Sequence, residues 1–273
     1  MFNIKSLDNA VNCRVVFLAV TYYEMVINMT FWGIMIPFIG TSLGSGCVLF
    51  MKKRMSPRVE QILLGFAGGV MVAASVWSLL IPSISRCAGL GRLAFLPATI
   101  GFVLGVCLLP AVDRITPRLK LGKTSLLALA VTIHNIPEGM AVGVIFAGVL
   151  YGNCGVTLAD AMALSIGIAI QNFPEGAIIS MPVMAQTGSR KKALLYGVLS
   201  GVVEPVTAGV TLVLFGLASV ALPYLLAFAA GAMIYVVVQE LIPQASRPDN
   251  PTASTLAFSL GFLVMMILDV AFG

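Results

Sequence analysis

The sequence QNFPEG at residues 171–176 repeats HNIPEG at residues 134–139, and each hexapeptide interrupts a long apolar stretch of the chain. Each hexapeptide places amide groups and a carboxylate where lipid-compatible side chains would otherwise stand. Ionisable residues inside a membrane are costly and mark a functional site by default. Matching polar interruptions in consecutive apolar segments point to a transport site. The two hexapeptides therefore indicate both the fold class and the functional class.

The composition is that of an all-α integral membrane protein. Of the 273 residues, 59% are hydrophobic and only 10% are charged, whereas a soluble domain has roughly 25% charged residues. The net charge of +5 does not indicate nucleic-acid binding, because the basic residues cluster in short loops between apolar segments. No linker or low-complexity stretch divides the chain, so residues 1–273 are predicted to form a single transmembrane transporter domain.

We expect a bundle of eight membrane-spanning helices, because eight apolar stretches approach the ~20 residues that a helix needs to cross a bilayer. Their predicted limits are 30–50, 61–82, 93–112, 124–150, 157–186, 192–219, 221–245 and 254–272. Residues 1–29 are predicted to form an N-terminal interfacial segment, since the apolar run at 15–20 is too short to span and lacks a cleavage site. An additional span at this position is the alternative.

The basic residues predict the orientation. Most of the 16 Lys and Arg residues lie in loops at 51–60, 113–123, 187–192 and 246–250, which the eight spans place on one side. The positive-inside rule assigns that side to the cytoplasm, so both termini are predicted outside. A short loop joins the fourth and fifth spans, so the two hexapeptides lie on antiparallel helices and form an inverted repeat.

The spacing inside the hexapeptides gathers ligand-type side chains on one helix face. Residues four apart share a face, which pairs His134 with Glu138 in the first hexapeptide and Gln171 with Glu175 in the second. An asparagine stands three residues before each glutamate. A lone buried histidine or a proline kink is common by itself, but the repeated combination with a glutamate indicates a site.

A third carboxylate is predicted at the same depth. Both hexapeptides lie about half-way along their spans, and Glu204, followed by Pro205, lies near the middle of the sixth span. Three ionised carboxylates would repel one another, and a divalent cation removes that repulsion. An imidazole with carboxylates and amides suits zinc, iron(II) or manganese better than magnesium. Without thiolates, binding should be moderate and exchangeable, as a transporter requires.

Glycine spacing predicts close helix packing. Gly139 and Gly176 follow the two glutamates and allow a neighbouring helix to approach. The pairs with small-xxx-small spacing are Gly65/Gly69, Gly101/Gly105 and Gly197/Gly201. In membrane helices this spacing is typical of close packing, which we favour over a ligand-binding role.

These motifs resemble those of the ZIP (Zrt-/Irt-like) family of divalent metal transporters, in its bacterial GufA-like branch. The resemblance covers nearly the whole chain and includes GSRKKA at 188–193 and SGVVEP at 200–205. It implies a binuclear metal centre at mid-membrane. The implied first site consists of His134, Glu138, Gln171 and Glu175. The implied second site consists of Asn135, Asn172 and Glu204, with Glu138 and Glu175 bridging the two.

Two features depart from the family pattern. Asn172 stands where other members carry Asp, and a neutral amide weakens the implied second site. Many members carry a histidine-rich loop between the third and fourth spans, but residues 113–123 contain no histidine and the chain has only 1. This loop therefore offers no metal sensor.

Three further polar residues lie along an expected pathway. Asp269, near the outer end of the eighth span, would attract cations at the entrance, and Glu240 with Gln239, near the inner end of the seventh, would receive them at the exit. The alternative is that these acids lie at the membrane interface and face water. Asp160 is expected at the interface.

The predicted function is import of a divalent transition metal toward the cytoplasm, first of all zinc, with Cd²⁺, Fe²⁺ and Mn²⁺ as related substrates. The two motif helices and their neighbours are expected to move as a unit against the remaining helices in an alternating-access cycle. The runner-up is a proton- or sodium-coupled carrier of a small solute that uses the acids as relays. A membrane metal receptor that does not transport is a third interpretation.

No enzymatic activity and no catalytic cofactor are expected. An intramembrane metalloprotease calls for a His-Glu-x-x-His motif, which a chain with 1 histidine cannot supply. The expected location is the cell membrane, as a multi-pass protein. The expected partners are the lipid bilayer and divalent metal ions, without nucleic acid, and a homodimer is compatible with the sequence.

Overall fold

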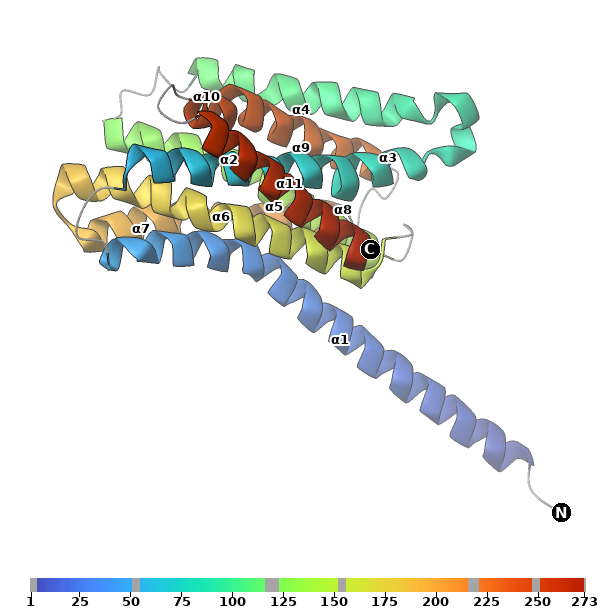
Figure 1. The fold of residues 1–273 in the computed structure, drawn as a ribbon. Coiled ribbons are helices and arrows are strands. Elements are labelled where there is room, and N and C mark those ends of the chain that lie inside the picture. Colours follow the sequence, from blue (N-terminus) through green and yellow to red (C-terminus); the bar gives the residue numbers. More distant parts are fainter. Residues whose placement is uncertain are drawn as a thin grey trace.

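A bundle of long helices makes up the computed structural model of this chain (Figure 1). The structure describes residues 4–50, 55–115, 123–151, 156–215, 221–246 and 251–272. Within these ranges every regular element is helical, which agrees with the predicted all-α class. The α-helices are α1 (Ile4–Gly46), α2 (Pro57–Ala74), α3 (Ile81–Ser85), α4 (Phe95–Ile115), α5 (Lys123–Leu150), α6 (Leu158–Thr187), α7 (Arg190–Gly201), α8 (Val203–Phe215), α9 (Leu222–Val236), α10 (Ile242–Ala245) and α11 (Pro251–Phe272).

Short helical segments of other types connect several of these helices. A π-helical segment, Ser75–Leu80, joins α2 to α3, and another, Val237–Leu241, joins α9 to α10. Two 3₁₀ segments, Cys47–Leu49 and Ala88–Leu93, follow α1 and precede α4. π-Helical turns are rare and often lie at functional sites.

The helices support a multi-pass membrane protein. Among the described residues, six helical stretches are long and apolar enough to cross a bilayer, by length and composition: Val20–Leu49, Pro57–Ser85, Leu158–Thr187, Arg190–Leu214, Leu222–Ala245 and Thr252–Ala271. The predicted spans 93–112 and 124–150 coincide with α4 and α5, whose described apolar parts are shorter, Phe95–Ala111 and Asn135–Leu150. A count of eight crossings therefore stays a prediction. In Figure 1, α1 begins and α11 ends toward the same end of the bundle, and placing that end outside also stays a prediction.

The N-terminal segment differs in form from the expectation. Residues 4–29 do not form an element of their own but continue into the first predicted span, so that α1 has 43 residues. At 1.5 Å per residue α1 is about 65 Å long, roughly twice the thickness of a bilayer core. Figure 1 shows its N-terminal part extending away from the bundle. The polar interruption at 21–24 contains neither glycine nor proline, so it does not end the helix.

Local capping sets the limits of α6 and thereby centres the second hexapeptide. The Thr157 side chain accepts a hydrogen bond from the Asp160 N–H at 3.1 Å, and the Asp160 carboxylate accepts one from the Thr157 N–H at 2.7 Å. This reciprocal arrangement is a capping box, so Asp160 has a structural role. At the other end Gly188 has φ 65°, the left-handed conformation that ends a helix.

Glycines bring pairs of helices into backbone contact, as the small-xxx-small spacing predicts. A Cβ at Gly65 or Gly69 would collide with the backbone of α11, and one at Gly101 or Gly105 with the backbone of α9. The remaining predicted pair, Gly197 and Gly201, lies against α1. The expected close packing is therefore confirmed.

The helices pack in two groups. Helix α1 packs on α6 and α7, and α5 packs on α8 and α6, while α2 packs on α11 and α4 on α9. Contacts between the groups run mainly from α2 to α6 and from α5 to α9. The two hexapeptides lie in the first group, which consists of α1, α5, α6, α7 and α8.

The contact between α1 and α6 can be tested with two neighbouring glycines. A Cβ at Gly44 would collide with the backbone of Phe173, inside the second hexapeptide, whereas a Cβ at Gly46 meets nothing within 4 Å. We expect Gly44→Ala to destabilise the protein by about 1–3 kcal/mol, as overpacking does, and Gly46→Ala to be neutral. Thermal unfolding in detergent measures both, and equal midpoints for the two variants would contradict the packing.

Candidate metal centre

Both hexapeptides lie well inside their helices, the first in α5 and the second in α6. Pro137 and Pro174 stand within helices that continue past them. The sixth predicted span instead divides at Val202 into α7 and α8, which places Glu204 and Pro205 in the first turn of α8. The first turn tolerates proline and favours an acid near the positive end of the helix dipole.

The glycine of each hexapeptide brings another helix to the site. A Cβ at Gly139 would collide with the backbone of Glu204, so α5 and α8 touch beside two glutamates. A Cβ at Gly176 would collide with the backbone of Thr41, so α6 and α1 touch in the same way. The close approach predicted for both glycines is confirmed.

A hydrogen bond joins the two hexapeptides directly. The Gln171 amide nitrogen donates to Glu138 Oε1 at 2.7 Å. Both side chains are fully buried, at 0% and 1% exposure. Because a hydrogen bond to a carboxylate is stronger than a neutral one, this contact fixes the side chains of α5 and α6 relative to each other.

A second hydrogen bond joins the first hexapeptide to the third glutamate. The Asn135 amide nitrogen donates to Glu204 Oε1 at 3.1 Å and to the Ser200 carbonyl at 3.2 Å. Asn135 and Glu204 are each 1% exposed. The sequence placed Glu204 at the depth of the hexapeptides, and the structure brings it to them.

Two more members of the predicted ligand set, Asn172 and Glu175, lie near the same carboxylates. Asn172 is buried beside the carboxylates of Glu138 and Glu204, and neither of its amide atoms has a well-aligned hydrogen bond. Glu175 is half-buried and lies close enough to Glu138, Glu204 and Glu240 for like charges to repel. The three glutamates on α5, α6 and α8 therefore interact pairwise, although no three acids among the described residues are close enough to form a metal-binding group.

These side chains leave a set of buried oxygen atoms without donors. Among the described residues, none of these atoms accepts a hydrogen bond: Asn135 Oδ1, Glu138 Oε2, Gln171 Oε1, Asn172 Oδ1 and Glu204 Oε2. A buried acceptor without a partner costs about 1–3 kcal/mol, and more when it is charged, so such groups call for an explanation. Carboxylate and amide oxygens are also the ligands that hard divalent cations take. A bound cation would satisfy several of them at once.

The role of His134 stays a prediction. Its backbone lies in α5, one turn before Glu138, but its side chain lies outside the described part of the structure. Among the side chains that are described, no three from His, Cys, Asp and Glu form a metal-binding group. The described centre instead mixes acids with amides, which is the mixture that the hexapeptides contain.

The three predicted pathway residues lie near segments of π-helix. Asp269 on α11 accepts a hydrogen bond from Ser78 Oγ at 2.6 Å through Oδ1, while its buried Oδ2 has no partner among the described residues. Glu240 is half-buried and Gln239 exposed, and both belong to Val237–Leu241. Ser78 belongs to Ser75–Leu80. Glu240 lies near the centre, because its carboxylate interacts with that of Glu175. Asp269 lies on α11, which carries none of the predicted cation ligands.

Two residues in these contacts were missed by sequence reasoning. Ser78 holds Asp269, and Thr41 of α1 donates a hydrogen bond to Glu204 Oε1 at 2.6 Å. Thr41 does lie one residue after Gly40, a glycine that packs on the backbone of α6. A hydroxyl beside a packing glycine is the only signal that the sequence offers for it.

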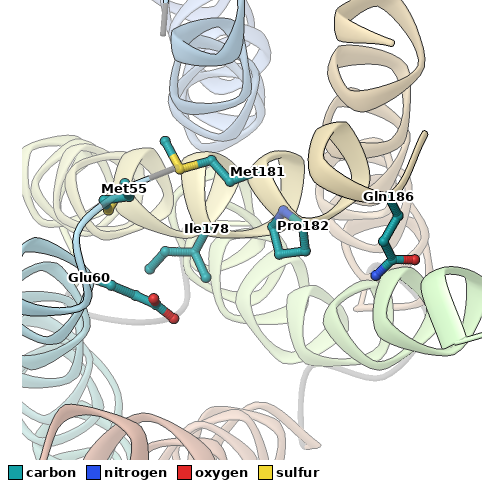
Figure 2. Close-up of a pocket in the computed structure, with 6 residues that line it drawn as sticks. All are labelled: Met55, Glu60, Ile178, Met181, Pro182 and Gln186. Carbon is teal, nitrogen blue, oxygen red and sulfur yellow. The ribbon is translucent and has the colours of Figure 1, made fainter. Parts of the chain in front are cut away.

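A cavity lies beside α6 on the C-terminal side of the second hexapeptide (Figure 2). Its volume is about 270 Å³, and it is lined by Met55, Glu60, Ile178, Met181, Pro182 and Gln186. Ile178, Pro182 and Gln186 follow Glu175 at helical spacing, so they share its face of α6. Figure 2 shows the Glu60 carboxylate and the Gln186 amide on the same side of α6 as Ile178 and Pro182.

Comparison with known proteins identifies the family. The sequence model described as "ZIP Zinc transporter" matches residues 123–269, which include both hexapeptides and Glu204. The chain belongs to the ZIP family. Its members are transporters, so the chain is not an enzyme.

The relatives of this ZIP chain match it over most of their lengths. The chain is 32% identical to zinc transporter ZIP11 of Homo sapiens, over 86% of this chain and 94% of that protein. It is 35% identical to zinc transporter ZIPB of Bordetella bronchiseptica, over 86% and 79% of the respective chains. It is 31% identical to zinc transporter GufA of Myxococcus xanthus, over 86% and 96%. The resemblance to the bacterial GufA-like branch is confirmed.

The Gln171–Glu138 hydrogen bond predicts a specific loss of stability. We expect Gln171→Leu to destabilise the protein by about 1–3 kcal/mol in the presence of a chelator, because the buried Glu138 carboxylate loses its donor. In a Glu138→Leu background the same substitution should have little effect. Chemical or thermal unfolding of the detergent-solubilised protein measures both.

Gln61→Leu is the matched control. Gln61 is 2% exposed, and neither of its amide atoms has a hydrogen-bond partner among the described residues. Replacing it with an apolar residue should therefore leave stability unchanged or improve it. Equal losses at positions 61 and 171 would refute a special role for the Gln171 contact.

Proposed function

We propose that this chain imports divalent transition-metal cations, zinc first, across the cell membrane through a two-cation site at mid-membrane. The observation that carries this proposal is the set of five buried oxygen atoms, on α5, α6 and α8, that accept no hydrogen bond among the described residues. Their surroundings are apolar helices that are long enough to cross a bilayer. The relatives named as zinc transporters support zinc as the cation.

The hydrogen bonds at the site orient its ligands in advance. Gln171 and Asn135 each use the amide nitrogen to hold a carboxylate oxygen, which leaves the amide oxygen free. Glu138 and Glu204 each have Oε1 held by a donor, and Oε2 has no partner among the described residues. Ligands fixed by surrounding hydrogen bonds need little reorganisation when a cation binds.

The two sites share their acids. We assign His134, Glu138, Gln171 and Glu175 to the first cation, and Asn135, Asn172 and Glu204 to the second, with Glu138 and Glu175 bridging. The bridging acids lie between two positive charges, which offsets the repulsion among the three glutamates. Neutral amides contribute weaker ligands than carboxylates would, and weak ligands allow the release that transport requires.

The route combines this centre with polar groups toward both ends of the bundle. Asp269, held by Ser78, is proposed at the outer entrance, and Glu240 with Gln239 at the inner exit. The proximity of Glu240 to Glu175 supports its place in the route. The cavity beside Glu60 lies farther along α6, toward the end that the basic loops predict to be cytoplasmic.

Alternating access is proposed as a motion between the two helix groups. The group of α1, α5, α6, α7 and α8 carries the cation ligands, while Asp269 and Glu240 belong to the other group. Within each group the helices meet through glycines at backbone contact, which favours motion as a unit. Between the groups the contacts run mainly through α2 with α6 and α5 with α9.

Zinc uptake tests the transport proposal. Proteoliposomes that contain the protein and a zinc-sensitive dye should take up zinc faster than empty vesicles. Glu138→Ala and Glu175→Ala should each lower the rate at least tenfold, because each removes a bridging charge. The matched control is Glu24→Ala, at an exposed acid of α1, which should transport normally. Folded protein that takes up no zinc would refute zinc transport. Uptake that needs a proton or sodium gradient but is unchanged by the Glu138→Ala and Glu175→Ala substitutions would favour the coupled carrier.

Asn172→Asp tests the second cation position. The new charge should tighten binding of the second cation by about tenfold. It should also lower the unfolding temperature in chelator, since a fourth acid joins the three glutamates. Calorimetric titration and thermal unfolding with and without zinc measure the two effects. Tighter binding without a loss in chelator would place Asn172 away from the acids.

A further inference from the structure

Helix α1 reaches the candidate metal centre, although neither the hexapeptides nor the family match, which begins at residue 123, includes it. Along the contact with α6, a Cβ at Gly40 would collide with the backbone of Ala169, and one at Gly44 with that of Phe173. Thr41 lies between these two glycines and is 1% exposed. The backbone of α1 is therefore held against α6 at the level of the second hexapeptide.

The Thr41 hydroxyl makes its shortest contact with a cation ligand. Oγ1 lies 2.6 Å from Glu204 Oε1 and 3.3 Å from the Pro37 carbonyl of its own helix. A hydroxyl has one proton to donate, and the short bond to the carboxylate is the charge-assisted one. The Thr41 hydroxyl therefore donates to Glu204 from α1, a helix to which no cation ligand is assigned.

Two donors then hold the same oxygen of Glu204. Oε1 accepts from Thr41 on α1 and from Asn135 on α5, whereas Oε2 accepts from no described residue. Fixing one carboxylate oxygen between two helices sets the direction of the other. A single donor would leave the carboxylate able to rotate about the bond to that donor.

Resting on the function proposed above, we infer that Thr41 is a positioning residue of the second cation site, which orients Glu204 so that Oε2 alone binds the cation. Ser45, one turn later on α1, supports this arrangement, because its hydroxyl donates to the Thr41 carbonyl at 2.8 Å and lies 3.3 Å from the carbonyl of Gly176. Helix α1 thus contacts the second hexapeptide and the third glutamate together.

Calorimetric titration of the purified full chain with Zn²⁺, and with Co²⁺ as a spectroscopic probe, tests this inference. Thr41→Val keeps the shape of the side chain and removes the hydroxyl. It should weaken the second cation about tenfold, the effect of one hydrogen bond to a charged group, and change the first less than twofold. The Co²⁺ spectrum of the second site should change with it. Thr41→Ser, which retains the donor, should bind as wild type does.

Thr207→Val is the matched control. Among the described residues, the Thr207 hydroxyl bonds to carbonyls of its own helix, those of Val203 at 2.7 Å and Glu204 at 3.2 Å, and not to the Glu204 carboxylate. This variant should bind both cations normally. If Thr41→Val does not fold, Thr41→Ser and Thr41→Ala give the same comparison between small side chains with and without a hydroxyl.

The outcomes separate this inference from the transport proposal. Two cations bound equally well by Thr41→Val and wild type would overturn the role of Thr41 and leave the two-cation site intact. Equal losses in the Thr41→Val and Thr207→Val variants, or equal losses at both cations, would reduce Thr41 to a packing residue. A wild type that binds one cation overturns the second site and this inference with it, and a wild type that binds none overturns the proposed function.

Discussion

Oxygen atoms without donors in the middle of an apolar bundle are the constraint on which the rest of the structure depends. No water is at hand in a bilayer to satisfy such atoms, and two of the side chains, Glu138 and Glu204, are ionisable as well. The chain answers part of this need internally, with the amide nitrogens of Gln171 and Asn135 and the hydroxyl of Thr41. The part left over is the acceptor set that suits a cation. The acceptors that protein donors leave unsatisfied are thus the ones that the proposed cation would bind.

The packing of the helices follows from the same need. Side chains as short as asparagine and threonine reach a partner helix only when the backbones nearly touch, and glycines at the crossings permit this. Gly139 brings α8 to α5, and Gly176 brings α1 to α6. A larger residue at either position would push these helices apart and so separate the donors from their acceptors.

Much of this arrangement could be predicted from the chain, and the limits have physical causes. The i, i+4 spacing in the hexapeptides and the matching depth of Glu204 foretold the convergence, since both follow from helix geometry alone.

The contact of Thr41 with Glu204 could not be foretold, because it joins residues 163 positions apart through a crossing that no local pattern encodes. The continuation of residues 4–29 into the first predicted span was not expected, because that segment was judged by its short apolar run, whereas only glycine or proline breaks a helix reliably. The division of the sixth span at Val202 has a local cause, because Pro205 has no N–H to donate to the Gly201 carbonyl four residues earlier. Ligation by His134 and the count of crossings remain predictions.

The hydrogen bonds to these carboxylates also bear on which ions the proposed centre can hold. Calcium takes six to eight oxygen ligands and often binds both oxygens of one carboxylate. Glu204 Oε1 accepts two hydrogen bonds, from Thr41 and Asn135, so Glu204 cannot bind an ion through both of its oxygens. Zinc is satisfied by about four ligands and loses nothing by this arrangement. At the proposed centre, the hydrogen bonds that orient Glu204 therefore also disfavour a cation that needs both oxygens of one carboxylate.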